Sequence, residues 1–297
     1  MITFILLGLE AKNEIESFTS QFESYSDFNF VSLYNWNTEN KTEYALLEDV
    51  LLLKMADYMT GKYFVTVLGT KNLDTVLPEI KAYCVEHSLP LVSKLIPQTT
   101  ADSMAGKVHS VVADIDSHDY ILSVEQLMEM RANLYRGKRN LLNRFNRFYA
   151  DVTTVRLIDL QSPAEVAEII ALNTYWREMT PQPKEETQTE FDAIKRSIEA
   201  AKALDIKALG VYVGNKLVAY VIFNILPNDG IMLHFEKSDH EFIGVTEFLN
   251  SQLAVHIHGT YGTTWINFQQ DLGIENLRRA KESYKPVSML KKYTVTY

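Results

Sequence analysis

The segment from His234 to Asp239 carries the side chains best suited to proton transfer. On a strand, side chains alternate between the two faces, so His234 and Glu236 point one way and Phe235 and Lys237 the other. A histidine and a glutamate that converge at a strand end can serve as acid and base. Such pairs are also common on exposed sheet faces, so an ordinary surface role is the alternative. We expect His234 and Glu236 to be catalytic and Lys237 to contact substrate.

A second polar group lies between Trp265 and Tyr284, where we expect a strand, a turn and then a helix. The turn gathers amides, a carboxylate and cations: Asn267, Gln269, Asp271, Arg278 and Lys281. Such groups can position a substrate or stabilise a developing negative charge. Ordinary capping and surface pairing, such as Glu275 with Arg279 four residues later, is the competing interpretation.

A run of cations without an acid lies between Arg131 and Arg147, in a chain whose net charge is −9. Residues 136–149 have helical spacing, with an apolar stripe of Leu141, Leu142, Phe145, Phe148 and Tyr149. Guanidinium groups match phosphate oxygens two at a time. The residues expected to bind phosphate are Arg136, Lys138, Arg139, Asn140, Asn143 and Arg144. We expect tRNA or another phosphorylated ligand as partner; a solvated basic face is the alternative.

Hydrophobic spacing predicts the elements that position these residues. In the first half, strands are expected at 30–36, 44–47, 50–55, 63–68, 91–96, 108–113 and 120–124, with a helix at 73–87. In the second half, a strand at 152–158 precedes helices at 162–177 and 191–201, joined by a solvated loop at 179–189. Strands follow at 208–213, 216–223, 230–235, 264–267 and 287–295, with helices at 242–257 and 274–284. Ile274, Leu277, Ala280 and Tyr284 are expected to face the core.

Length and composition limit the class of protein. A chain of 297 residues with 46% hydrophobic and 23% charged residues predicts two globular domains. The negative charge argues against double-stranded DNA as a partner. A single cysteine, Cys84, excludes an internal disulfide and favours the cytoplasm. No apolar run approaches the ~18 residues of a membrane span, and no metal-ligand cluster, P-loop or dinucleotide-binding motif is present.

Several ordered blocks resemble the phosphatidylglycerol lysyltransferase C-terminal-like family, from about residue 30 to the end. The blocks are Lys138-Arg139-Asn140; His234-x-Glu236-Lys237-Ser238-Asp239; the helix Gly244–Ala254; and Asn267-x-x-x-Asp271-Leu272-Gly273-x-x-x-Leu277-Arg278-x-Ala280-Lys281. The resemblance implies an α/β (α+β) fold of two tandem GNAT-like domains, at 1–150 and 151–297. Each would be a mixed, mostly antiparallel sheet flanked by helices.

The resemblance also implies transfer of an aminoacyl group from charged tRNA, with Asp271 and Lys281 positioning substrate or stabilising the acyl oxygen. Phe268 and Gln269 stand where an Arg-Glu pair is expected. CoA-dependent enzymes hold pyrophosphate on a basic loop at a helix N-terminus. Here residues 236–244 carry Glu236, Asp239 and Glu241 against Lys237 alone, so CoA is disfavoured and no other cofactor is indicated. The alternatives are a non-catalytic ligand- or peptide-binding module and a CoA-dependent N-acetyltransferase.

Overall fold

A computed structural model describes residues 2–130, 135–181 and 184–297. The chain folds into two compact units. The first comprises Met1–Tyr120, Gln270–Arg278 and Met289–Tyr297, and the second Ile121–Gln269 and Arg279–Ser288. Residues 121–150 therefore fall in the second unit, whereas the sequence analysis divides the chain at residue 150. The division into two GNAT-like domains stays a prediction.

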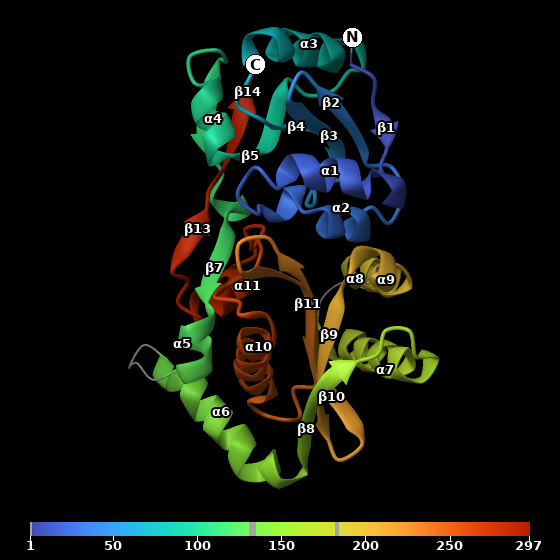
Figure 1. Cartoon of the computed structure of the whole chain (residues 1–297), viewed down its shortest axis with the longest axis vertical. Helices are drawn as coiled ribbons and strands as arrows, with labels where there is room; N and C mark the ends of the chain where they lie inside the picture. The colour runs from blue at the N-terminus through green and yellow to red at the C-terminus, as the bar shows by residue number, and fades with distance from the viewer. Residues whose placement is uncertain (1, 131–134, 182–183) are drawn as a thin grey trace. The chain divides into compact units, whose positions relative to one another are not determined.

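The first unit contains two small sheets and their helices (Figure 1). Within the described residues one sheet has the order β1-β2-β3-β4 and the other β5-β14-β6. The strands are β1 (Ile5–Leu6), β2 (Glu43–Leu47), β3 (Val50–Ala56), β4 (Tyr63–Leu68), β5 (Val92–Pro97), β6 (Ser110–Ala113) and β14 (Lys292–Thr296). The helices are α1 (Lys12–Thr19), α2 (Phe30–Trp36), α3 (Leu73–Glu86) and α4 (Gln98–Met104). β14, late in the chain, lies between two strands that precede it by well over half of the sequence.

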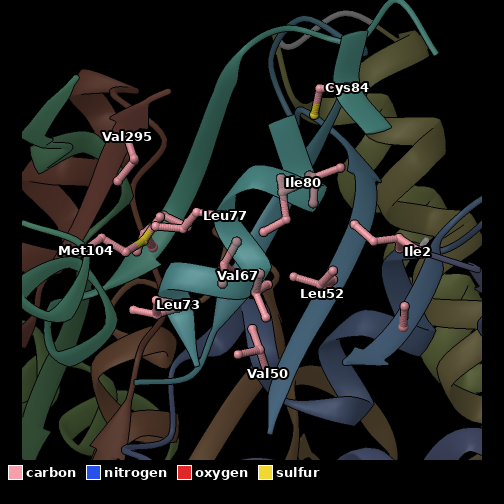
Figure 2. Packing of buried hydrophobic residues seen from close by; sticks show 14 of the residues in the cluster. Ile2, Val50, Leu52, Val67, Leu73, Leu77, Ile80, Cys84, Met104 and Val295 are labelled. Carbon is pink, nitrogen blue, oxygen red and sulfur yellow. The ribbon is translucent and has the colours of Figure 1, made fainter. Parts of the chain in front are cut away.

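The main apolar core of the first unit lies between α3 and the β3–β4 hairpin. The spacing of apolar residues in 73–87 predicts this helix, and α3 buries that face. Figure 2 shows Leu77 and Ile80 of α3 in one cluster with Leu52 of β3 and Val67 of β4. Val295 of β14 belongs to the same cluster, so the last strand contributes to this core.

A second feature of the first unit is a buried charged network around Lys292. The Lys292 ammonium donates to Asp27, to Asp119 Oδ1 at 2.7 Å, to Ser26 Oγ at 3.1 Å and to Gln270 Oε1 at 3.0 Å. Lys292 and Asp119 have no exposed side-chain surface. Although burial opposes its charge, the two carboxylates raise the pKa of Lys292. Burial, with the charge of Asp119, raises the pKa of Asp27. The network joins four segments that are distant in sequence.

The second unit is built on a sheet whose described strands run in the order β13-β7-β12-β11-β10-β9-β8. The strands are β7 (Asp119–Ser123), β8 (Thr153–Ile158), β9 (Lys207–Val213), β10 (Lys216–Leu226), β11 (Gly230–Ser238), β12 (Trp265–Asn267) and β13 (Ser288–Leu290). The helices are α5 (Val124–Glu129), α6 (Arg136–Tyr149), α7 (Pro163–Met179), α8 (Lys184–Glu199), α9 (Ala201–Leu204), α10 (Val245–Tyr261) and α11 (Glu275–Glu282). The division between the units passes through β7, α11 and β13, whose residues 119–120, 275–278 and 289–290 belong to the first unit. β11 and β12 pair in parallel, while β8 to β11 are antiparallel neighbours. No described helix has the length and apolarity to cross a membrane.

Mixed α/β architecture with antiparallel sheets flanked by helices is confirmed, but three expected elements are wrong. Residues 30–36 form α2 rather than a strand, because the Asn29 side chain accepts from Ser32 N–H at 3.1 Å and caps a helix. In the expected loop at 179–189, α8 begins at Lys184; residues 182–183 lie outside the described part. The expected strand at 287–295 is divided into β13 and β14, which join different sheets.

Candidate active site

β11 carries the His-x-Glu pair and contains a β-bulge. Ile222 of β10 lies opposite Phe235, but the next residue, Phe223, lies opposite Leu233. His234 is therefore the extra residue of β11 at this point. A bulge interrupts the strict alternation of side chains and gives the residues around it new directions. His234 and Glu236 accordingly have different hydrogen-bond partners.

His234 is buried on the sheet and pairs with Asn224 of β10. Its Nε2 lies 2.6 Å from Asn224 Oδ1, an atom that can only accept, so Nε2 carries the hydrogen. Burial lowers the pKa of His234 to about 3. The imidazole is therefore neutral at physiological pH. It holds the bulge in place, and the expected acid–base role stays a prediction.

Glu236 lies on the side of β11 that faces α10. Asn250 Nδ2 of that helix donates to Glu236 Oε2 at 3.0 Å. Burial raises the pKa of Glu236 to about 7, and the nearby Glu247 carboxylate adds to the effect. The Asn250 hydrogen bond and the Lys138 charge oppose it. The side chain is only partly buried. A reachable carboxyl group that titrates near neutrality is suited to general base catalysis.

Tyr284, which follows α11, places a hydroxyl beside the same amide. Asn250 Nδ2 lies 3.2 Å from the Tyr284 hydroxyl oxygen. Burial, followed by the charges of Glu236 and Glu247, raises the pKa of Tyr284 well above its usual value. The phenol therefore keeps its proton and can donate it. The Tyr135 hydroxyl donates to the backbone carbonyl of Tyr284 at 2.8 Å and so helps to hold Tyr284 in position.

Lys138 of α6 closes this group of side chains. Its ammonium donates to Glu247 Oε1 at 3.0 Å and lies 3.9 Å from the centre of the Tyr284 ring. This cation both neutralises Glu247 and packs on the tyrosine face. The structure thus brings Glu236, Asn250, Tyr284, Lys138 and Glu247 together in the second unit. We call these five residues the Glu236 cluster.

The other polar residues of α6 lie outside the Glu236 cluster. Arg136, Asn140, Asn143, Arg144 and Arg147 are exposed. Arg139 is half-buried and donates to the Met130 carbonyl at 3.0 Å. The expected apolar stripe is wrong in part: Phe145 is its buried member, while Phe148 is 64% exposed. Because Phe145 is the buried residue of α6, most of the helix surface faces solvent. Arg131 lies outside the described residues.

Gly244 explains how α6 approaches the start of α10 so closely. Its φ of +92° lies in the left-handed region that favours glycine. A Cβ atom here would lie 2.0 Å from the Leu141 carbonyl oxygen. Phe145 of α6 packs on Phe248 of α10 with ring centres 4.6 Å apart. This contact brings Lys138 to Glu247 and so builds one side of the Glu236 cluster.

Lys237 lies on the opposite face of β11 from Glu236. Its ammonium donates to both carboxylate oxygens of Glu190, each at 2.8 Å, and lies 3.7 Å from the Trp176 ring centre. The side chain is buried. These contacts attach α7 and α8 to the sheet. The expected substrate contact of Lys237 therefore has no support in this geometry.

Asp271 and Arg278 form a structural pair in the first unit. Arg278 Nε donates to Asp271 Oδ2 and Nη2 to Oδ1, both at 2.9 Å, while Gly273 N–H donates to Oδ1 at 2.8 Å. Arg278 also donates to Asp116 at 2.6 Å. Burial works to raise the pKa of Asp271, but these hydrogen bonds outweigh it and lower the pKa. A carboxylate with so many donors anchors the turn and is poorly suited to accept another proton.

The other residues of this turn organise the end of β12. Asn267 Oδ1 accepts from Gln269 N–H at 2.7 Å, and Gln269 has a φ of +58°. Gln269 Nε2 donates to the Leu233 carbonyl at 2.7 Å, just beyond the last paired residues of β11 and β12. The Lys281 ammonium donates to the Phe268 carbonyl. Phe268 packs on Tyr284 with ring centres 5.7 Å apart. Asn267, Gln269 and Lys281 thus shape the backbone beside the cluster.

The sequence analysis missed Asn250 and Glu247 and gave Tyr284 only a core role. A signal for Asn250 was present, since it interrupts the apolar face of a helix that buries Leu249 and Leu253. The partnership with Glu236 depends on how α10 packs on β11, which spacing does not reveal. Within the described residues, no group of three or more His, Cys, Asp or Glu side chains could hold a metal ion.

Residues 19–296 match the model of a family described as phosphatidylglycerol lysyltransferase, C-terminal. Curated proteins give no match. Among solved structures, a conserved protein of unknown function from Bacteroides thetaiotaomicron VPI-5482 is 26% identical, with a TM-score of 0.86 over 99% of each chain. L-PGS from Bacillus licheniformis is 13% identical, with a TM-score of 0.65 over 96% of this chain and 91% of that chain. A tandem GNAT protein from the clavulanic acid biosynthesis pathway is 8% identical, with a TM-score of 0.51 over 100% and 99%.

Proposed function

Because the chain belongs to the phosphatidylglycerol lysyltransferase C-terminal family, the family that its sequence motifs predict, we propose that it is an acyltransferase with Glu236 as general base. The observation that carries the proposal is the environment of Glu236. Burial and Glu247 raise the pKa of its carboxyl group to about 7, and Asn250 holds the group in place. A base is most effective when its pKa lies near the working pH.

The reaction that fits these groups is transfer of an acyl group to a nucleophile bearing a proton. The nucleophile loses its proton to Glu236 and forms a bond to the acyl carbon. The bond from that carbon to the leaving atom breaks, and the leaving atom takes a proton. Tyr284 is a donor for this step, because its phenol stays protonated and its oxygen lies 3.2 Å from the amide that holds Glu236. The proton that Glu236 has taken then returns to the Tyr284 phenolate, so both side chains regain their starting states.

An aminoacyl-tRNA donor is part of this proposal. Arg136, Arg144 and Arg147 are exposed on α6, and the helix contains no acid to pair with them. Guanidinium groups suit the phosphates of a nucleic acid strand. Lys237, near the end of β11 and before α10, is bound to Glu190, which supports a donor other than CoA.

The departure from the family pattern at Phe268 and Gln269 has a bearing on this proposal. Phe268 packs on Tyr284, and the Gln269 amide donates to the Leu233 carbonyl. Both side chains thus act in shaping the turn. In the proposed mechanism the carboxylate needed for catalysis comes from Glu236 on β11, so an acidic residue at position 269 is not required.

The test uses the full chain and tRNA charged with a mixture of radiolabelled amino acids, in the presence of a small-molecule extract as acceptor source. Loss of label from tRNA, above the rate without protein, measures transfer. Glu236→Gln should reduce this rate on the order of 10²-fold or more. Glu241→Gln, an exposed change in the loop that follows, is the matched control and should leave the rate unchanged. Equal rates for Glu236→Gln and the native chain would contradict the assignment of the base.

A further inference from the structure

The two polar atoms of the Asn250 amide differ in their hydrogen bonding. Its Nδ2 donates to Glu236 Oε2 and to the Thr246 carbonyl, both at 3.0 Å, and lies 3.2 Å from the Tyr284 hydroxyl. Its Oδ1 is buried and has no hydrogen-bond partner among the described residues. The reverse orientation would place Oδ1 against the Thr246 carbonyl, two acceptors with no hydrogen between them. The oxygen is therefore the atom left without a partner.

A buried acceptor without a partner favours a ligand that has a hydrogen-bond donor. Leaving a buried polar atom unpaired costs about 1–3 kcal/mol, and a later hydrogen bond recovers that cost because folding has already removed the water. Oδ1 belongs to the same planar amide as the nitrogen that touches Glu236. A group that gives a proton to Glu236 is thus close to an oxygen that can accept a second hydrogen.

The charges around Glu236 favour a cation at this point. Lys138 is paired with Glu247, and Lys237 with Glu190 on the other face of the sheet. Among the described residues, Glu236 has no ion-pair partner of its own, so its ionised form leaves one uncompensated negative charge. An ammonium ion would neutralise this charge, whereas a hydroxyl group would not.

We propose that the nucleophile accepted by this site is a primary amine, held between the Glu236 carboxylate and Asn250 Oδ1. The inference rests on the proposed role of Glu236. A primary ammonium group has enough hydrogens for both acceptors, and after losing one proton to Glu236 it still donates to Oδ1 while its lone pair attacks the acyl carbon. The bond from the acyl carbon to the leaving atom breaks as that atom takes the Tyr284 proton, and the second proton that the nitrogen loses returns to Tyr284. A hydroxyl group has a single hydrogen, which Glu236 takes, and Oδ1 stays unpaired. The product is an amide rather than an ester.

The test compares amines with alcohols of the same shape, so that the donor need not be known. The probes are hexylamine with hexanol, glucosamine with glucose, and glycinamide with glycolamide, followed by calorimetry and by the shift in melting temperature. At least one amine should bind the native chain about tenfold or more tightly than its alcohol partner. Asn250→Leu should remove that preference and leave the alcohol's affinity unchanged.

Two controls separate folding from recognition and this inference from the proposed function. Asn173→Leu removes another buried asparagine of the second unit, which contacts Tyr220, and should keep the amine preference. The inference is overturned if no amine exceeds its alcohol partner, or if Asn250→Leu keeps the preference. Either result leaves the general base untouched, because that role depends on the transfer rate of Glu236→Gln. Conversely, amine binding with full activity in Glu236→Gln would reject the base and keep the amine site.

Discussion

Asn250 donates to the Glu236 carboxylate at 3.0 Å from a helix position with no exposed surface. The carboxylate is thereby held by the packed interior of the second unit, although it lies close enough to the surface to be reached. Groups held in this way lose little freedom when a substrate binds. We therefore expect changes in α10 that displace Asn250 to alter Glu236 even when they do not touch a substrate.

The pH dependence of transfer should report the ionisation of Glu236. A general base acts in its ionised form, and burial raises the pKa of Glu236 to about 7. The native rate should therefore rise with pH through about 7 and then level off. In Glu236→Gln this step should vanish from the profile of kcat/KM. A step of the same position in the variant would assign the ionisation to another group.

The stability of the protein should also change with pH through Glu236. The pKa of this carboxyl group is about 7 in the folded state, above the 4.5 expected when unfolded. The folded state therefore binds more protons between these values, and its stability falls as pH rises through this window. Glu236→Gln should be more stable than the native chain by about 1–3 kcal/mol at pH 8 and nearly equal at pH 4. Urea unfolding at both pH values measures the difference, and a gain that is the same at pH 4 would contradict the cause given.

Tyr284→Phe removes the proposed proton donor while keeping the ring that Phe268 and Lys138 contact. The transfer rate should fall roughly 10–10²-fold, since general acid catalysis is lost. The melting temperature should change little, because the aromatic packing is retained. Tyr261→Phe, at the end of α10, is a matched control that should keep the native rate. A native transfer rate in Tyr284→Phe would show that Tyr284 is not the proton donor.

Lys292→Met should destabilise the first unit strongly. The change leaves Asp27 and Asp119 buried without their cation, which typically costs about 3–5 kcal/mol. Lowering the pH should restore part of the loss, because burial raises the pKa of Asp27 and its protonation removes one of the two buried charges. Lys291→Met, at the exposed neighbouring position, should be close to native. Equal denaturant midpoints for the two variants would show that the network adds little stability.

Binding of tRNA should depend on the exposed arginines of α6. Replacing Arg144 and Arg147 by Gln should weaken binding and reduce the slope of log K against log salt by about 0.7–0.9 for each lost phosphate contact. Arg156→Gln is the control, because Arg156 lies on β8 and is paired with Glu165 at 2.6 Å. Unchanged binding in the double variant would remove α6 from the proposed donor site.

The sequence predicted the fold well where local signals were strong. The helix expected at 162–177 is α7, which Ser162 caps, and the apolar spacing of 73–87 predicted α3. α2 was missed because its aromatic and β-branched residues outweighed the Asn29 cap. For the site, Glu236 was found from its type and place on a strand. Its actual partner, Asn250, could not be found, since the packing of α10 on β11 joins residues that no spacing rule connects.

The sheet order β5-β14-β6 has a consequence for how the protein is made. β5 and β6 leave the ribosome early, yet the strand that pairs with both, and that carries Lys292, is translated only after the whole second unit. At roughly 5–20 residues per second, that interval is on the order of ten seconds or more. During this interval the edges of β5 and β6 that pair with β14 have no partner strand, and Asp27 and Asp119 lack Lys292. The first unit, although it begins the chain, should therefore be the last to complete its fold during synthesis.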